Sequence, residues 1–104
     1  MEHMSMDELH EIADGLGTDD LILDVRSDEE FQEGHIKGAR NVPHEEVGAI
    51  ADELKNLNKV YVHCKLGGRA KLAAETLTNA GLTNIICVSK DGMERWMKMG
   101  WPVE

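Results

Sequence analysis

The residues of this chain best suited to chemistry lie in the segment Val-Tyr-Val-His-Cys-Lys-Leu-Gly-Gly-Arg at positions 60–69. An apolar run ends at Cys64, two glycines follow, and Arg69 then precedes a helical pattern. This order predicts a buried strand, a tight turn and a helix start, with a thiol at the turn. Because ligands bind beyond the carboxyl ends of parallel strands, Cys64 is predicted to lie where binding sites form.

The predicted turn favours a negatively charged sulfur. The first N–H groups of the following helix and its dipole attract an anion, and Gly67 and Gly68 are expected to accept positive φ angles and to keep the turn free of Cβ atoms. Lys65 and Arg69 add local positive charge. We therefore predict a nucleophilic thiolate at Cys64, suited to forming a persulfide, a thiophosphate ester or an arsenical. The hypothesis requires inward N–H groups and a sulfur open to solvent.

Length, charge and cysteine content restrict the class of protein. The 104 residues predict one domain, residues 1–104, with a single core. A net charge of −9 argues against nucleic acid or an anionic membrane as a partner, and no apolar run of about 18 residues predicts a membrane span. The N-terminal residues do not resemble a secretory signal, so a reducing, cytoplasmic location is expected. Cys87 lies in an apolar run and is expected in the core rather than in a disulfide with Cys64.

Short apolar runs alternate with helical patterns along the chain, which predicts an α/β fold with a mostly parallel sheet and helices on both faces. Strands are predicted at residues 21–25, 40–42, 59–63 and 85–88. Helices are predicted at residues 6–16, 28–34, 44–54, 69–80 and 93–99. Capping boxes at Ser5 to Glu8 and Ser27 to Glu30 mark the first two helix starts. Residues 1–4 are interpreted as a frayed end with a short strand or cap rather than a metal site, and nothing in the sequence demands a dimer.

Four motifs resemble those of the single-domain rhodaneses, the family of sulfurtransferase homology domains, in the right order and at the right spacing. The resemblance covers about residues 5–104. The motifs are Asp24-Val25-Arg26 at a strand end, the segment 30–43 with Gly-His-Ile-Lys-Gly-Ala at 34–39, the Cys-x-x-Gly-x-Arg loop at 64–69, and a C-terminal group of Gly92, Met93, Trp96, Gly100 and Pro102.

The resemblance implies a three-layer sandwich with about five mostly parallel strands, and a two-step sulfur transfer. The Cys64 thiolate would attack the outer sulfur of a small anionic donor such as thiosulfate, or of a persulfide or polysulfide, and would then hold a persulfide. The backbone N–H groups that would bind this persulfide belong to Lys65, Leu66, Gly67, Gly68 and Arg69. A thiol, cyanide or a protein cysteine would take the sulfur, and neither a metal nor an organic cofactor is implied.

Three residues depart from the family pattern. Ala70 stands where the family often has Ser, and Leu66 stands where a polar residue would help to bind thiosulfate. Asp91-Gly92 replaces a usual glycine pair, and Asp91 is expected near the pocket mouth, where it would disfavour a dianionic donor. These departures bear on the identity of the donor more than on the persulfide step.

Two other functions compete with a sulfurtransferase. One is a sulfur carrier or regulatory binding module that docks a protein partner through Lys65 and Leu66. The other is a phosphatase or arsenate reductase on the same scaffold. The active-site motif of such enzymes is His-Cys followed by five residues and Arg. Only four residues separate Cys64 from Arg69 here, so the turn is tighter and suits sulfur better than a tetrahedral phosphate.

Two neighbouring polar residues have structural and functional interpretations. Arg26 could attract an anionic donor, but an ion pair with Asp24, Glu29 or Glu30 is the favoured interpretation. His63 directly precedes Cys64. Because successive side chains of a strand point to opposite faces, His63 is predicted to point away from the sulfur.

Overall fold

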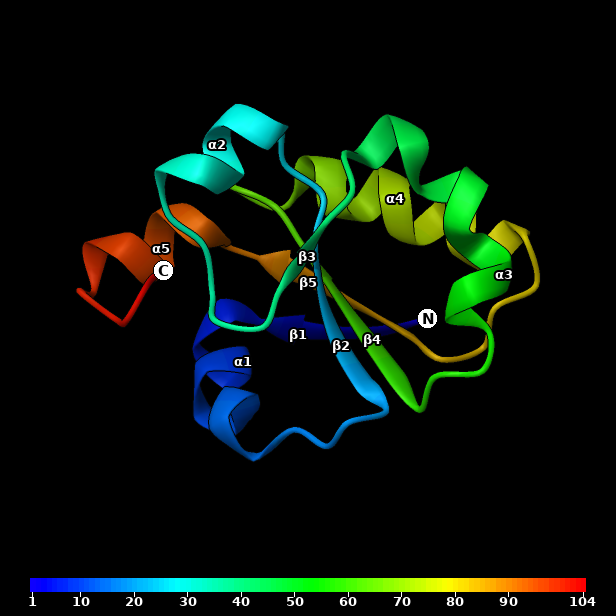
Figure 1. The fold of residues 1–104 in the computed structure, drawn as a ribbon, viewed down its shortest axis with the longest axis horizontal. Coiled ribbons are helices and arrows are strands. Elements are labelled where there is room, and N and C mark those ends of the chain that lie inside the picture. The colour runs from blue at the N-terminus through cyan, green and yellow to red at the C-terminus, as the bar shows by residue number, and fades with distance from the viewer.

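A computed structural model describes residues 1–104 and contains one five-stranded sheet in the order β1-β5-β4-β2-β3 (Figure 1). Every neighbouring pair of strands is parallel. The strands are β1 Glu2–Ser5, β2 Asp20–Asp24, β3 Arg40–Asn41, β4 Lys59–His63 and β5 Ile85–Lys90. The predicted α/β class is confirmed, and β4, which leads into Cys64, is the central strand.

Helices cover both faces of this sheet. They are α1 Met6–Ile12, α2 Asp28–Glu33, α3 Ala51–Leu54, α4 Gly68–Asn79 and α5 Met93–Lys98, with 3-10 helices η1 Ala13–Gly15 and η2 His44–Ile50. Residues of η2, α3 and α4 share one buried cluster with the sheet, whereas α1 and α5 share a second, smaller cluster on the other face. Figure 1 shows α3 and α4 on the side of the strands opposite to α1.

The strand side chains alternate between these two clusters. In β4, Val60 and Val62 lie in the larger cluster and Tyr61 lies in the smaller one. Because both faces of a covered parallel sheet are buried, apolar residues run continuously along the strand. The apolar runs at residues 21–25, 59–63 and 85–88 therefore predicted the strands correctly.

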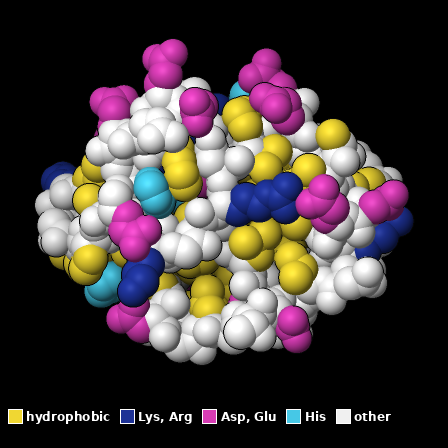
Figure 2. All heavy atoms as spheres, viewed as in Figure 1, with side chains coloured by type: hydrophobic (Ala, Val, Ile, Leu, Met, Phe, Trp, Pro, Cys, Tyr) yellow, Lys and Arg dark blue, Asp and Glu magenta, His cyan; other side chains and the backbone are white.

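Both predicted capping boxes are present. The Ser5 hydroxyl accepts the Glu8 N–H at 3.1 Å, and the Ser27 hydroxyl accepts the Glu30 N–H at 3.2 Å. In each box the glutamate carboxylate accepts the N–H of the serine in return. Figure 2 shows acidic side chains gathered over α2, where the first turn carries Asp28, Glu29 and Glu30. Carboxylates at a helix N-terminus are stabilised by the exposed N–H groups there.

The prediction of one helix over residues 44–54 was wrong in detail. Residues 44–50 form the 3-10 helix η2, and only residues 51–54 are α-helical. Gly48 lowers helix propensity in the middle of this segment, and Ile50 has φ −108° and ψ 7°, which breaks the helical path. Val47 and Leu54 are nevertheless buried as the spacing predicted.

The N-terminal region also differs in extent from the prediction. The first α-helix ends at Ile12 rather than at residue 16, and η1 continues it. Residues 2–5 form β1, which pairs with β5, so the expected short strand is confirmed. No helix of the structure combines the length and the apolar character needed to cross a membrane.

Candidate active-site loop

The loop after β4 directs two backbone N–H groups at the sulfur of Cys64. The Gly67 N–H donates to Sγ at 3.0 Å, and the Ala70 N–H donates at 3.3 Å. Gly67 is the N-cap of α4, and Ala70 lies in its first turn. The first N–H groups of a helix have no partner within the helix, so they are free to bind the sulfur. Among the N–H groups of residues 65–69, which were predicted to turn inward, that of Gly67 donates to Sγ, so the prediction is confirmed for Gly67.

Ala70 was not among the residues expected to bind the sulfur. The sequence draws attention to position 70 only through the missing serine hydroxyl. Its backbone N–H contributes regardless of the side chain, since a helix that starts at Gly68 leaves the N–H of Ala70 unpaired. The helix start itself was therefore the signal that could have identified this donor.

The two loop glycines have different roles. Gly67 has φ 115°, in the left-handed region, and a Cβ there would overlap the carbonyl oxygen of Ser89. Gly68 does not have a positive φ, and a Cβ there would meet no atom within 4 Å. The prediction that both glycines supply positive φ is thus wrong for Gly68, because this residue already has helical geometry as the first residue of α4.

The start of α5 holds the peptide that carries the thiol. The Met93 N–H donates to the Cys64 carbonyl at 2.8 Å, and the Glu94 N–H donates to the Lys65 carbonyl at 3.2 Å. A Cβ on Gly92 would overlap both of these carbonyls. Asp91 is exposed and has φ 64°, a left-handed conformation that Asp tolerates better than most residues. The C-terminal motif therefore supports the loop directly.

The sulfur is not open to solvent. Cys64 is 1% exposed and belongs to the larger buried cluster. Its neighbours Lys65 and Leu66 are exposed, with Leu66 at 62%, and they form the rim above the turn. The requirement for an accessible sulfur is therefore not met in this conformation, because Cys64 is packed within the larger buried cluster.

Arg69 does not provide a free positive charge. Its guanidinium binds the Glu30 carboxylate with N–O distances of 2.6 and 3.0 Å. This pairing lowers the pKa of Glu30 to about 2 and raises the pKa of Arg69. The expectation that Lys65 and Arg69 both add charge at the turn is therefore wrong for Arg69, because its charge is balanced by α2.

The Glu30–Arg69 pair gives a testable pH dependence. Because the folded-state pKa of Glu30 lies below its ordinary value of 4.5, the pair stabilises the fold above that value and loses its contribution as pH falls toward 2. We expect the difference in unfolding free energy between wild type and Glu30→Gln to shrink by about 1–2 kcal/mol from pH 6 to pH 2.5. Urea unfolding of both proteins across this range measures it. Gln can retain the capping box, so a constant difference would contradict the assignment.

Asp24 and Arg26 form a buried ion pair at the end of β2. The Arg26 guanidinium donates to the Asp24 carboxylate at 2.7 Å through Nη2 and at 3.0 Å through Nε, and it also donates to the Gly34 carbonyl at 2.8 Å. Asp24 is fully buried and Arg26 is 4% exposed. The predicted ion pair is confirmed for Asp24, and neither Glu29 nor Glu30 takes part.

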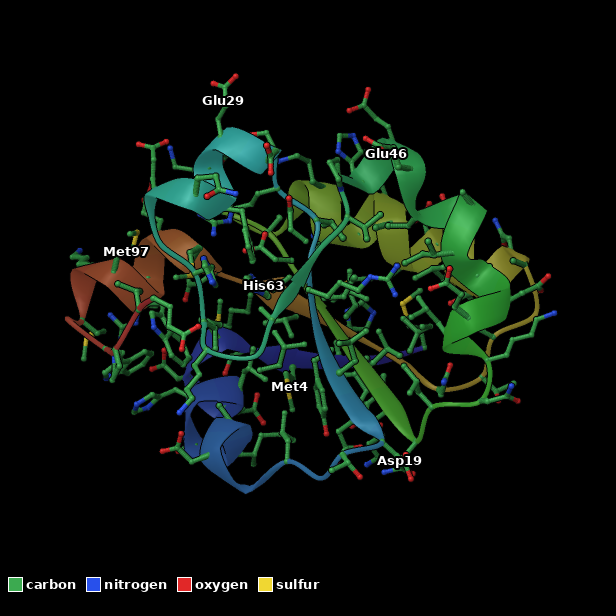
Figure 3. The ribbon with its side chains drawn as sticks, viewed as in Figure 1. Met4, Asp19, Glu29, Glu46, His63 and Met97 are labelled. Atoms are coloured by element: carbon green, nitrogen blue, oxygen red, sulfur yellow. The ribbon has the colours of Figure 1, made fainter.

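His63, labelled near the centre of Figure 3, is fully buried. Its Nε2 lies 3.8 Å from an Asp24 carboxylate oxygen, and its Nδ1 lies 3.4 Å from the Cys64 carbonyl oxygen rather than from the sulfur. Burial lowers the pKa of His63. The side chain thus contacts the backbone and the carboxylate, in agreement with the prediction that it points away from Sγ.

Cys87 lies in β5 and is fully buried, as expected. Burial raises the pKa of its thiol, and both cysteines of the chain are free. A thiol of this kind behaves as a small apolar side chain of the core. Cys64 is therefore the cysteine whose sulfur accepts hydrogen bonds from backbone N–H groups.

Comparison with known proteins identifies the fold and its family. The family model described as "Rhodanese-like domain" matches residues 5–99. A solved structure of a rhodanese-related protein from Thermoplasma volcanium superposes with a TM-score of 0.80 at 28% identity, and covers 100% of this chain and 98% of that chain.

Two curated relatives carry names that refer to sulfur. Thiosulfate sulfurtransferase 16, chloroplastic, from Arabidopsis thaliana is 34% identical over 79% of this chain and 78% of that protein. The putative sulfur carrier protein YrkF from Bacillus subtilis is 39% identical over 72% of this chain. The chain spans only 40–59% of the length of the Bacillus subtilis relatives that it matches. Since the family model covers nearly the whole chain, this protein belongs to the rhodanese-like domain family.

Proposed function

We propose that residues 1–104 act as one domain that accepts a sulfane sulfur on Cys64 as a persulfide and passes it to an acceptor thiol. The observation that supports this proposal is the pair of N–H donors from Gly67 and Ala70 directed at Sγ. Hydrogen bonds from oriented backbone N–H groups stabilise an anionic sulfur at the end of the central strand. The remaining N–H groups of residues 65–69 are proposed to bind the outer sulfur.

The proposed reaction balances without an oxidant or a metal. The Cys64 thiolate attacks the outer sulfur of a donor R–S–SH, a new Sγ–S bond forms, and the donor's S–S bond breaks with its electron pair on R–S. In the second step an acceptor thiolate attacks the outer sulfur of the persulfide, and the electron pair of the Sγ–S bond returns to Sγ. With thiosulfate as donor, the leaving group would be sulfite.

Cys64 is 1% exposed, so this conformation does not meet the requirement for an open sulfur, and the proposal needs a movement that uncovers Sγ. A persulfide adds a second sulfur about 2 Å beyond Sγ. We infer that the donor enters past Lys65 and Leu66, the exposed rim residues, and that the rim moves when the sulfur is loaded. A partner protein that displaces this rim would make the domain a sulfur carrier rather than an enzyme for small acceptors.

The pairing of Arg69 argues against phosphate chemistry. In a Cys-dependent phosphatase the loop arginine would bind the phosphoryl oxygens, whereas this guanidinium already binds both oxygens of Glu30. The short spacing from Cys64 to Arg69 also argues against binding of a tetrahedral phosphate. Sulfur transfer is therefore the function that this geometry supports best.

The proposal is tested by mass spectrometry of the intact protein. Wild type treated with polysulfide or thiosulfate and then desalted should gain one sulfur atom, and cyanide should remove it. Cys64→Ser should gain none, and Cys87→Ser should load like wild type. Equal loading of wild type and Cys64→Ser, or no loading from any donor, would refute the proposal. Loading followed by very slow transfer to small thiols would favour the carrier function.

A further inference from the structure

The surface beside the Cys64 loop contains a groove of about 260 Å³. The loop contributes Lys65 to it, α2 contributes Glu30 and Glu33, and α5 contributes Glu94. Backbone hydrogen bonds from α5 to Cys64 and Lys65 fix this groove next to the thiol-bearing peptide. Neither Cys64 nor Arg69 lines the groove, so its charges act on a molecule on its way to the loop rather than in contact with Sγ.

Most of the positive charge near the loop is already neutralised. Arg69 binds Glu30, and Arg26, which also lines the groove, binds Asp24. Lys65 is exposed and has no ion-pair partner, but Glu33 and Glu94 are exposed and unpaired as well. Carboxylates therefore outnumber cations around the groove, in a chain whose net charge is −9.

Charges of this kind act across distances longer than a contact. The Debye length at physiological ionic strength is about 8 Å, so carboxylates that flank the groove repel an anion before it reaches the rim. Arg69 adds little attraction for a dianionic donor such as thiosulfate, because its Nη1 and Nη2 groups already donate to the Glu30 carboxylate. An ammonium group beside a thiol would instead be attracted.

We propose that the Cys64 site selects thiols and persulfides that carry positive charge near the sulfur, and that Glu30 is the residue that sets this selectivity by neutralising Arg69. The inference rests on the proposed sulfur transfer. Glu30 acts through Arg69 and the local field, so it is a specificity-determining residue rather than a catalytic one. Removing its charge leaves the Arg69 guanidinium without its carboxylate partner, on the residue that directly precedes Ala70.

The test measures transfer from persulfidated protein to three small thiols of different charge. Cysteamine carries an ammonium group, 2-mercaptoethanol is neutral, and mercaptoacetate carries a carboxylate. Protein is first loaded with polysulfide and desalted, and loading is confirmed by mass, so failure to load refutes the proposed function and not the selectivity. For each thiol, the ratio of the rate constants of Glu30→Gln and wild type cancels the thiol's intrinsic reactivity.

At low salt, Glu30→Gln should accelerate transfer to mercaptoacetate about three- to tenfold, leave 2-mercaptoethanol within about twofold, and slow transfer to cysteamine. The effects should shrink in 0.5 M salt, which a purely structural change would not produce. Glu53→Gln is the matched control. Glu53 lies on α3 and forms an exposed ion pair with Arg40, so this variant also removes one carboxylate charge from a pair with arginine. Equal ratios for the three thiols, or the same ordering in Glu53→Gln, would overturn the proposal.

Discussion

Replacing Gly67 by alanine is expected to destabilise the protein by about 3 kcal/mol and to abolish persulfide loading. Gly67 has φ 115°, which costs an L-residue about 1–2 kcal/mol, and the new Cβ would overlap the Ser89 carbonyl oxygen in β5. The backbone must therefore move at the residue whose N–H donates to Sγ at 3.0 Å. Urea unfolding gives the loss of stability, and intact mass after polysulfide treatment gives the loading.

The neighbouring glycine is the control for this prediction. Gly68→Ala places a methyl group where no atom lies within 4 Å, on a residue with helical geometry. Its stability should stay within about 0.5 kcal/mol of wild type or rise slightly, since alanine reduces the entropy of the unfolded chain. Its loading should be unchanged. Equal losses in the two variants would mean that the loop does not depend on the left-handed conformation of Gly67.

The contrast between these two glycines shows what the sequence could and could not predict. A Gly-Gly pair after a strand indicated a turn and a helix start, and both are present at the expected positions. The assignment of φ to one glycine depends on where the helix begins, and a one-residue shift in that boundary exchanges their roles. The close approach of Gly67 to Ser89 joins residues far apart in the chain, so local patterns did not reveal it.

The charges at the site were harder to predict than the fold. Continuous apolar runs predicted the strands because burial on both faces leaves a local signature in the sequence. The partner of Arg69 is Glu30, from a helix 39 positions earlier, and Glu30 had a complete local explanation in its capping box. Arg26 was predicted correctly because its partner Asp24 lies two positions away. Long-range ion pairs are therefore where the sequence-based description of the site was incomplete.

Arg26→Ala is expected to destabilise the fold by about 3–5 kcal/mol, because it leaves the buried Asp24 carboxylate without its cation. The Gly34 carbonyl also loses its guanidinium donor. The measurement is urea unfolding at neutral pH. Arg40→Ala is the control, since it removes an exposed ion pair with Glu53 and should cost about 0.5 kcal/mol or less.

A double variant separates two contributions to the free energy of unfolding: the cost of a buried unpaired charge and the net contribution of the ion pair. Asp24→Leu with Arg26→Met removes both charges and keeps apolar volume, so it should recover much of the stability that Arg26→Ala loses. If Arg26→Ala instead cost no more than Arg40→Ala, the buried ion pair would not stabilise the fold. Loss of persulfide loading in a double variant that remains folded would mean that the pair, and not only the fold, is needed for sulfur loading.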